Sequence, residues 1–269
     1  MILANHGIIS SSRGVLYDAD ALAFMTAASI TDNTQKTAIN TLVTDLKSYN
    51  IWTKMKAIYP FVGGTATTHK FNLKDPRDLD VAYRLEFFGG WTHSSTGSLP
   101  NGTTAYADTK INENTVMTLN SQHLSYYSRT DILGAYADMG LWDSTLLIGS
   151  QMLSRVVYPS SDSFTGYVQD GSNTYVANTD SRGLFVMNRI SSSVLKLQKN
   201  STISSFTSNV GAKSNLNFFI GARNLIGAAS LYTPRESSFA SIGDGLSDTE
   251  ASNFYTAVQA YQTTLNRQV

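Results

Sequence analysis

Aromatic side chains in turn-rich, polar sequence are the residues of this chain that are best suited to bind a sugar. A sugar in water is bound by stacking its apolar face on an aromatic ring, while Asn and Asp side chains supply directional hydrogen bonds. Four aromatic residues lie in such sequence and are candidates for glycan stacking: Trp91, Tyr106, Tyr127 and Trp142. Each could equally be a core or interface residue, because aromatic side chains dominate buried area.

Catalytic carboxylates for glycoside cleavage would show a different pattern. Acidic residues on alternate positions of one strand share a face, and two of them close together can act as acid and nucleophile. The only dense acidic run of the sequence is KDPRDLD, from Lys74 to Asp80, where Pro76 cannot donate to a strand ladder and Arg77 lies beside Asp78. We interpret the run as a polar loop. We therefore expect no catalytic residues and no enzymatic activity.

Metal ligands and cofactor loops are also poorly represented. The oxygen-rich segments Asp75–Asp80 and Asp170–Asn173 lack the ligand spacing of a calcium motif, so solvated turns explain them and a structural ion is the alternative. The four histidines, His6, His69, His93 and His123, have no zinc-ligand spacing, and the chain has no cysteine. We expect no metal site and no cofactor.

Composition limits the partners. Of the 269 residues, 42% are hydrophobic and 15% are charged, and 20 basic residues balance 20 acidic ones. A chain without a basic excess is a poor partner for nucleic acid, and a net charge near zero suits a subunit that associates with other copies. The start of the chain lacks the features of a signal peptide, and no apolar run is long enough for membrane insertion. These features predict folding in a cytoplasm.

The first part of the chain, residues 1–56, has helical patterns. Residues 18–26 are compatible with a short helix that carries acidic residues at its start, and Asp32 with Gln35 is typical of a capping box. An apolar stripe at helical spacing follows, formed by Ile39, Leu42, Val43 and Leu46. Such a helix either covers its own domain or docks on a partner chain. We name residues 1–56 an N-terminal helical docking segment.

Residues 57–269 read as an all-β jelly roll. Short runs rich in β-branched and aromatic residues alternate with Gly and Asn turn signals, which favours a sandwich of two antiparallel sheets. The strands are expected at 57–62, 83–88, 103–107, 123–128, 183–188, 194–198, 201–204 and 218–222. A capping helix is expected over 247–267, because Ser247 and Glu250 form a capping box and Phe254, Val258, Tyr261 and Leu265 share one face.

The C-terminal third resembles the concanavalin A-like lectin/glucanase domains of the laminin-G-like type. In that family a hairpin is followed by a strand of the form "fIGAR" and by a turn and helix of the form "LsdaE". The matching segments here are LKLQKN at 195–200, FIGAR at 219–223 and ASIGDGLSDTE at 240–250. The closing strand departs from the family pattern at Gly243-Asp-Gly245, where a longer edge is common. The resemblance implies a concanavalin-like jelly roll.

A second likeness covers most of the chain. The segments 52–62, 71–75, 89–91 and 242–246 resemble proteins of tailed bacteriophages, in which such domains are usually part of virion structural or fibre proteins. The resemblance implies a non-enzymatic virion component of the tail, neck, fibre or capsid surface. Its partners would be other virion proteins and copies of itself, and its location the virion after folding in the host cytoplasm. The alternative is a carbohydrate-binding module that recognises host cell-surface glycans.

Overall fold

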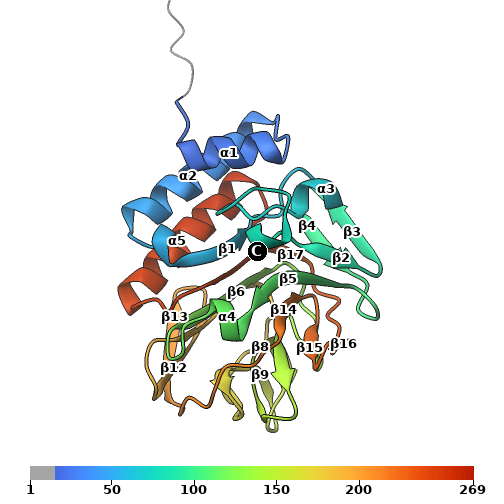
Figure 1. Cartoon of the computed structure of the whole chain (residues 1–269), viewed down its shortest axis with the longest axis vertical. Coiled ribbons are helices and arrows are strands. Elements are labelled where there is room, and N and C mark those ends of the chain that lie inside the picture. The colour runs from blue at the N-terminus through green and yellow to red at the C-terminus, as the bar shows by residue number, and fades with distance from the viewer. Residues whose placement is uncertain (1–15) are drawn as a thin grey trace, which may run out of the picture.

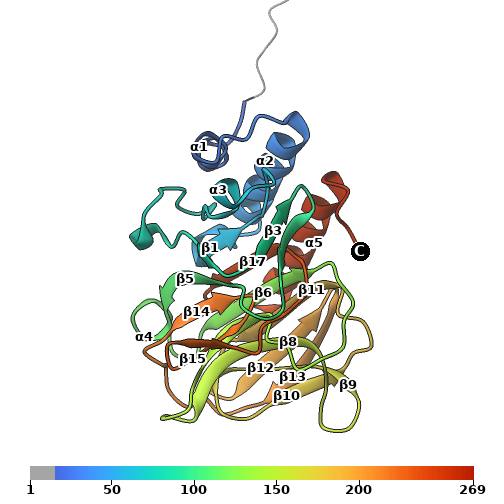
Figure 2. The ribbon, with the colours of Figure 1, turned by 90° about the vertical axis from the view of Figure 1, so that its right-hand side faces the viewer.

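The structure, a computed structural model, describes residues 16–269 and consists of three layers. Two β-sheets pack face to face, and a layer of helices covers the outer face of one of them (Figures 1 and 2). The all-β sandwich with helical pieces near both ends of the chain is therefore confirmed. Within the described residues no helix is long and apolar enough to cross a membrane.

The first sheet lies in the middle of the three layers and is antiparallel throughout. Its strands follow the order β13 (Thr202–Thr207), β12 (Val194–Lys199), β11 (Gly183–Arg189), β6 (Gln122–Ser128), β17 (Ser237–Gly243), β4 (Gly97–Pro100) and β3 (Trp91–Ser94), and β1 (Met55–Tyr59) also pairs with β17.

The second sheet forms the other side of the sandwich. Its strands follow the order β10 (Thr174–Ala177), β9 (Asp162–Asp170), β8 (Ile148–Val157), β7 (Met139–Asp143), β14 (Asn217–Ile220), β5 (Tyr106–Asn112) and β2 (Glu86–Phe88). A small hairpin of β15 (Arg223–Leu225) and β16 (Ala228–Ser230) joins β7, and β15 runs parallel to β7.

The helices gather on the far side of the first sheet. The helical layer consists of α1 (Ala19–Ala27), α2 (Asn33–Ser48) and α5 (Asp248–Thr264) (Figure 1). Single turns elsewhere are α3 (Ala66–His69), α4 (Glu113–Val116), η1 (Trp52–Lys54) and η2 (Asp80–Ala82). The predicted capping box of Ser247 and Glu250 is complete on α5. Asp32 caps α2 by accepting from the backbone N–H of Gln35, but the Gln35 side chain accepts from Gly63 instead of closing the predicted box. Asp18 accepts from the backbone N–H of Asp20 at the start of α1.

Two hydrophobic cores explain the three layers. Tyr126 and Tyr127 are consecutive on β6 and point to opposite faces of the first sheet, as strand geometry requires. Tyr126 lies in the core between the two sheets, while Tyr127 lies in the core between the first sheet and the helices. Because both faces are covered, β6, β11 and β17 are buried at every position.

The apolar stripe of α2 is buried in the helical core of its own chain, next to α5. Helices from both sides of the expected boundary at residue 56 thus form one layer. The division at residue 56 and the docking role of residues 1–56 stay predictions, and residues 1–15 lie outside the described part. The expected strand at 83–88 is shorter, because Tyr83 has a φ of 59° and ends the turn η2.

Tyr261 fastens α5 to the sandwich and provides a test of the helical layer. Its side chain is 1% exposed, packs on Phe239, and donates a 2.9 Å hydrogen bond to the carbonyl of Pro60. Replacing Tyr261 with alanine should cost about 3–5 kcal/mol of unfolding free energy in urea titrations. Tyr261→Phe keeps the ring and should cost only about 1 kcal/mol. A loss below about 0.5 kcal/mol for the alanine variant would contradict burial of this face.

Candidate functional site

An open pocket lies where the edges of the two sheets face each other. The second sheet ends in β10 and the first sheet ends in the β12–β13 hairpin, and Figure 2 shows these strands on the same side of the sandwich. Between them is a cavity of about 460 Å³, which we call the mouth pocket. It is lined by Val176, Ala177, Asn178, Thr179, Leu197, Lys199, Asn200, Ser201, Thr202 and Ser204. This volume lies in the range of small-molecule sites.

The turn of the β12–β13 hairpin forms one wall of the pocket. Asn200 adopts the left-handed conformation that such a turn needs, with a φ of 52°. Its backbone N–H donates to the carbonyl of Leu184 and its side-chain oxygen accepts from the N–H of Leu184, at 2.8 and 2.9 Å. Gly183 makes this close approach possible, because a Cβ there would lie 2.5 Å from the Asn200 side chain. The wall is therefore fixed to the neighbouring strand.

Lys199 supplies the charge of the pocket. Its ammonium donates to the side-chain oxygen of Asn178 at 2.5 Å and to the carbonyl of Asp180 at 2.6 Å. It also lies 5.6 Å from the centre of the Phe185 ring. Burial lowers the pKa of Lys199, and the nearby carboxylates of Asp180 and Asp131 counteract this shift. These two acceptors use two of the three ammonium donors, so the described residues leave one donor for a ligand.

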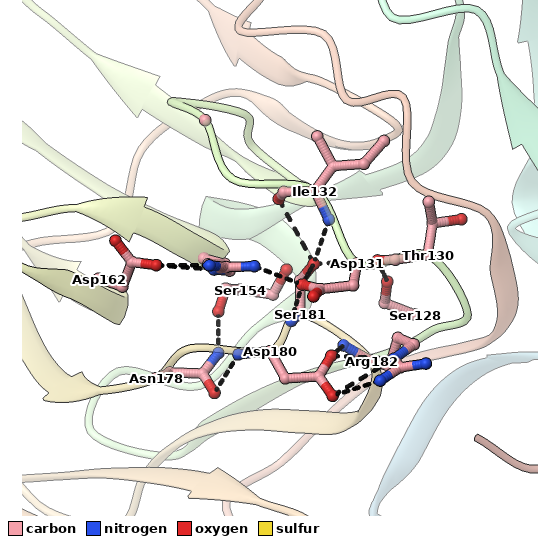
Figure 3. A network of polar contacts seen from close by, with 12 residues as sticks. Ser128, Thr130, Asp131, Ile132, Ser154, Asp162, Asn178, Asp180, Ser181 and Arg182 are labelled. Carbon is pink, nitrogen blue, oxygen red and sulfur yellow. Dashed lines mark hydrogen bonds and ion pairs between the residues drawn. The ribbon is translucent and has the colours of Figure 1, made fainter.

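A polar network holds the opposite wall, residues 177–182, in place (Figure 3). Asn178 donates to the carbonyl of Ser154 at 2.6 Å. The carboxylate of Asp131 accepts from the backbone N–H of Ser181 at 2.9 Å, and the Ser181 hydroxyl donates to the carbonyl of Thr130. Asp180 pairs with Arg182 at 2.9 Å. The pocket is therefore built on a segment that hydrogen bonds and an ion pair hold in place.

Two of the four predicted stacking residues, Trp91 and Tyr106, lie together, at the other end of the sandwich. The Trp91 indole N–H donates to the carbonyls of Phe88 and Tyr106, at 3.0 and 3.3 Å. Tyr106 lies between Phe88 and Phe219, with ring centres 4.8 and 4.6 Å apart and interplanar angles of 13° and 29°. Both faces of the Tyr106 ring are thus covered by protein.

The other two predicted residues lie elsewhere. Tyr127 is 0% exposed in the core beneath α5, because its side of the first sheet is covered by the helices. Trp142 is half-buried on β7 and contacts the ring of Tyr167 edge-on. None of the four residues lines the mouth pocket. Their role in stacking glycans stays a prediction, and Tyr127 could take part only if the helical layer moved.

The acidic segments considered for metal binding are engaged with cations. Asp75 pairs with Arg77, while Asp78 pairs with Lys70 and Arg84. Asp170 accepts from Ser208 and from backbone N–H groups, and lies 3.6 Å from Arg189. Within residues 16–269 no group of three or more His, Cys, Asp and Glu side chains is placed to hold a metal ion.

Sequence patterns alone did not single out Lys199 and Asn178 as site residues. The hairpin at Lys199–Asn200 is predicted from sequence, but the strand β10 that faces it is not. The two side chains meet only because the edges of different sheets face each other across the mouth. The sequence signal that could have indicated this site is the hairpin turn at Lys199–Asn200, where a lysine precedes a turn asparagine.

Comparisons with known proteins give distant structural likenesses, among them three solved structures. No family model matches the chain, and no curated protein matches it. Domain 4 of AbnA, a GH43 extracellular arabinanase from Geobacillus stearothermophilus, in complex with arabinotriose, is 11% identical with a TM-score of 0.49, over 75% of this chain and 98% of that one. The botulinum neurotoxin serotype D binding domain is 9% identical with a TM-score of 0.47, over 77% of this chain and 52% of that one.

The NanB sialidase from Streptococcus pneumoniae is 15% identical with a TM-score of 0.37, over 50% of this chain and 24% of that one. The matches thus span about half of the neurotoxin binding domain and about a quarter of the sialidase. The assignment of this chain as a β-sandwich rests on its own strand pairing.

Proposed function

We propose that this chain is a carbohydrate-binding β-sandwich domain and that the mouth pocket holds the glycan. The observation that carries the proposal is the chemistry of the lining. Hydroxyl side chains of Thr179, Ser201, Thr202 and Ser204 line the pocket together with Lys199. Hydroxyls both donate and accept, so they match the hydroxyl groups of a sugar. The resemblance to lectin-like domains also predicts a glycan ligand.

The proposal concerns binding without chemical turnover. Asp180, which follows the pocket-lining residues 176–179, is held by Arg182, which keeps the pKa of Asp180 below its usual range. An ionised, paired carboxylate is unsuited to donate a proton to a leaving sugar, because a glycosidase acid needs a raised pKa. Release of reducing sugar from a bound oligosaccharide would count against this part of the proposal.

The virion role is a separate proposal that rests on sequence resemblance alone. It is compatible with glycan binding if the domain is displayed on an exposed appendage of a particle. Fractionation of purified particles, with antibodies against this chain, would test the virion location and its virion partners. A protein found only in the soluble fraction of infected cells would contradict it.

A variant that fills the pocket tests the site. Ala177 is exposed and lines the mouth pocket, so Ala177→Trp adds bulk there without removing an existing contact. On an array of neutral and acidic glycans, the wild-type protein should give saturable binding to a restricted set. We expect Ala177→Trp to weaken that binding at least about tenfold, which corresponds to about 1.4 kcal/mol.

A matched control distinguishes the effect of filling the pocket from the effect of adding a tryptophan elsewhere on the surface. Ala228 is also an exposed strand alanine, but it lies in β16 and does not line the pocket. Ala228→Trp should bind as the wild type does. Equal binding by the wild type and Ala177→Trp would move the site elsewhere, and an array without any saturable signal would refute glycan binding.

A further inference from the structure

A second depression continues the mouth pocket along the same two strands. It has a volume of about 440 Å³ and is lined by Asn173, Thr174, Tyr175, Phe206 and Thr207. On β10 its residues 173–175 directly precede residues 176–179 of the mouth pocket. On the β12–β13 side, residues 206–207 follow residues 199–204. The β10 side and the β13 side thus run in opposite directions along one groove, which consists of the mouth pocket and the second depression.

The two halves of this groove differ in chemistry. The mouth pocket presents hydroxyls, an amide and the ammonium of Lys199, whereas the second half adds the rings of Tyr175 and Phe206. Tyr175 is 45% exposed, and an edge-to-face contact with Tyr158 at 5.5 Å holds its ring. Phe206 is half-buried and packs on the sandwich core. A fixed, exposed ring is suited to stack on the apolar face of a sugar.

The length of the groove indicates the size of the ligand. Successive strand residues rise by about 3.3 Å, so the stretch from Asn173 to Asn178 spans about 16 Å. A single sugar ring fills only part of such a length. The groove runs along β10 and β13, the edge strands of the two sheets.

From the shared strands and the complementary halves we infer that the ligand is a segment of a linear oligosaccharide, several sugar units long. Lys199 and Asn178 hydrogen-bond one unit, and Tyr175 stacks on another. This inference rests on the proposed function and names the ligand class for the same site. The gain in affinity should therefore come from the number of units rather than from a single terminal sugar.

A length series tests the inference. Ladders of cello-, xylo- and arabino-oligosaccharides, from one to six units, would be titrated calorimetrically into the full chain beside the glycan array. In the ladder that binds, affinity should rise by at least about tenfold between one and four units and then level off. Tyr175→Ala should remove about tenfold of affinity for the four-unit ligand and leave the one-unit ligand unchanged, whereas Tyr175→Trp should keep the gain.

A second aromatic variant serves as the control. Phe88 is a partly exposed ring on β2, away from the groove, so Phe88→Ala should leave the whole series unchanged. Equal affinity for one and four units, with binding still blocked by Ala177→Trp, would overturn the chain-binding inference and leave the proposed function intact. No binding by any ladder or array glycan would overturn both.

Discussion

Replacing Arg235 with methionine is expected to destabilise the fold by about 3–5 kcal/mol, enough to leave much of the protein insoluble. Arg235 and Asp138 are both 0% exposed and form an ion pair at 3.0 Å. The guanidinium also donates to the carbonyls of Ile132 and Arg155, each at 2.6 Å. Methionine fills the space but leaves the Asp138 charge and these carbonyls without their partner.

The same contacts connect the core to the mouth pocket. Arg235 donates to the carbonyl of Ile132. The preceding residue, Asp131, accepts from the backbone N–H of Ser181, which lies two residues beyond the pocket-lining Thr179 (Figure 3). Folded protein recovered from the Arg235→Met variant should therefore bind glycan more weakly than the wild type. The hydrogen bonds of Ile132 with Arg235 and of Asp131 with Ser181 connect the buried ion pair to the segment beside the pocket.

Urea titration of three variants tests this account. Arg235→Lys keeps a charge but cannot reproduce the fork of hydrogen bonds, so it should fall between wild type and Arg235→Met. Adding Asp138→Asn to Arg235→Met removes the unpaired charge and should recover part of the loss, which a double-mutant cycle measures. A loss below about 1 kcal/mol for Arg235→Met would show that the pair is dispensable.

Acidification is expected to destabilise the protein between pH 6.5 and 4.5 by several kcal/mol. Burial lowers the pKa of His69 to about 3 and that of His123 to about 4. Above pH 6.5 both histidines are neutral in the folded and unfolded states. Below pH 6.5 the two histidines are protonated in the unfolded chain but stay neutral in the folded chain. Each histidine therefore lowers the free energy of unfolding by about 1.4 kcal/mol per pH unit until its folded pKa is reached.

The hydrogen bonds of these histidines require the neutral rings. His123 has a carbonyl, that of Asp244, 2.7 Å from Nδ1, so Nδ1 carries the proton and Nε2 accepts from Ser241 at 3.0 Å. His69 accepts from the backbone N–H of Gly64 at Nε2 and therefore donates from Nδ1 to His93 at 2.9 Å. Protonation of His69 places its Nε2–H opposite the backbone N–H of Gly64, whereas protonation of His123 requires the Ser241 hydroxyl to turn and accept.

The unfolding free energy in urea, measured at pH 7, 6 and 5, tests this prediction. We expect little change from 7 to 6.5 and a loss of about 2–3 kcal/mol per pH unit from 6 to 5. The slope should hardly change between low and high salt, because desolvation rather than surface charge causes it. Glu113 opposes the trend, since burial raises its pKa. An unfolding free energy that is flat from pH 7 to 5 would contradict neutral, buried histidines.

Local patterns allowed much of the fold to be predicted. The cap residues Asp32 and Ser247 and the apolar stripes of α2 and α5 depend on neighbours three or four positions away, and the structure confirms them. The sequence predicts helices that cover the sandwich, but it does not predict which sheet they cover. The sequence QHLSYYS of β6 shows neither whether a helix will cover the Tyr127 side nor which tyrosine faces the other sheet.

The candidate site depends on contacts that no local pattern encodes. Asn178 and Lys199 are 21 residues apart and belong to different sheets, and the segment that supports them is held by Arg235, 103 residues from Ile132. The stacking residues proposed from sequence were chosen by residue type and nearby turns. That criterion cannot distinguish a ring that lies between two others, such as Tyr106, from an exposed one such as Tyr175.

Amide shift mapping by NMR, with the tightest-binding array oligosaccharide added to the intact protein, tests most directly whether the sheet edges form a glycan site. The account predicts saturable shifts concentrated in residues 173–179 and 199–207, which in Ala177→Trp should require at least about tenfold more oligosaccharide. Shifts centred instead on the Phe88–Tyr106–Phe219 stack or on the helical layer would contradict it, as would a spectrum that the sugar leaves unchanged.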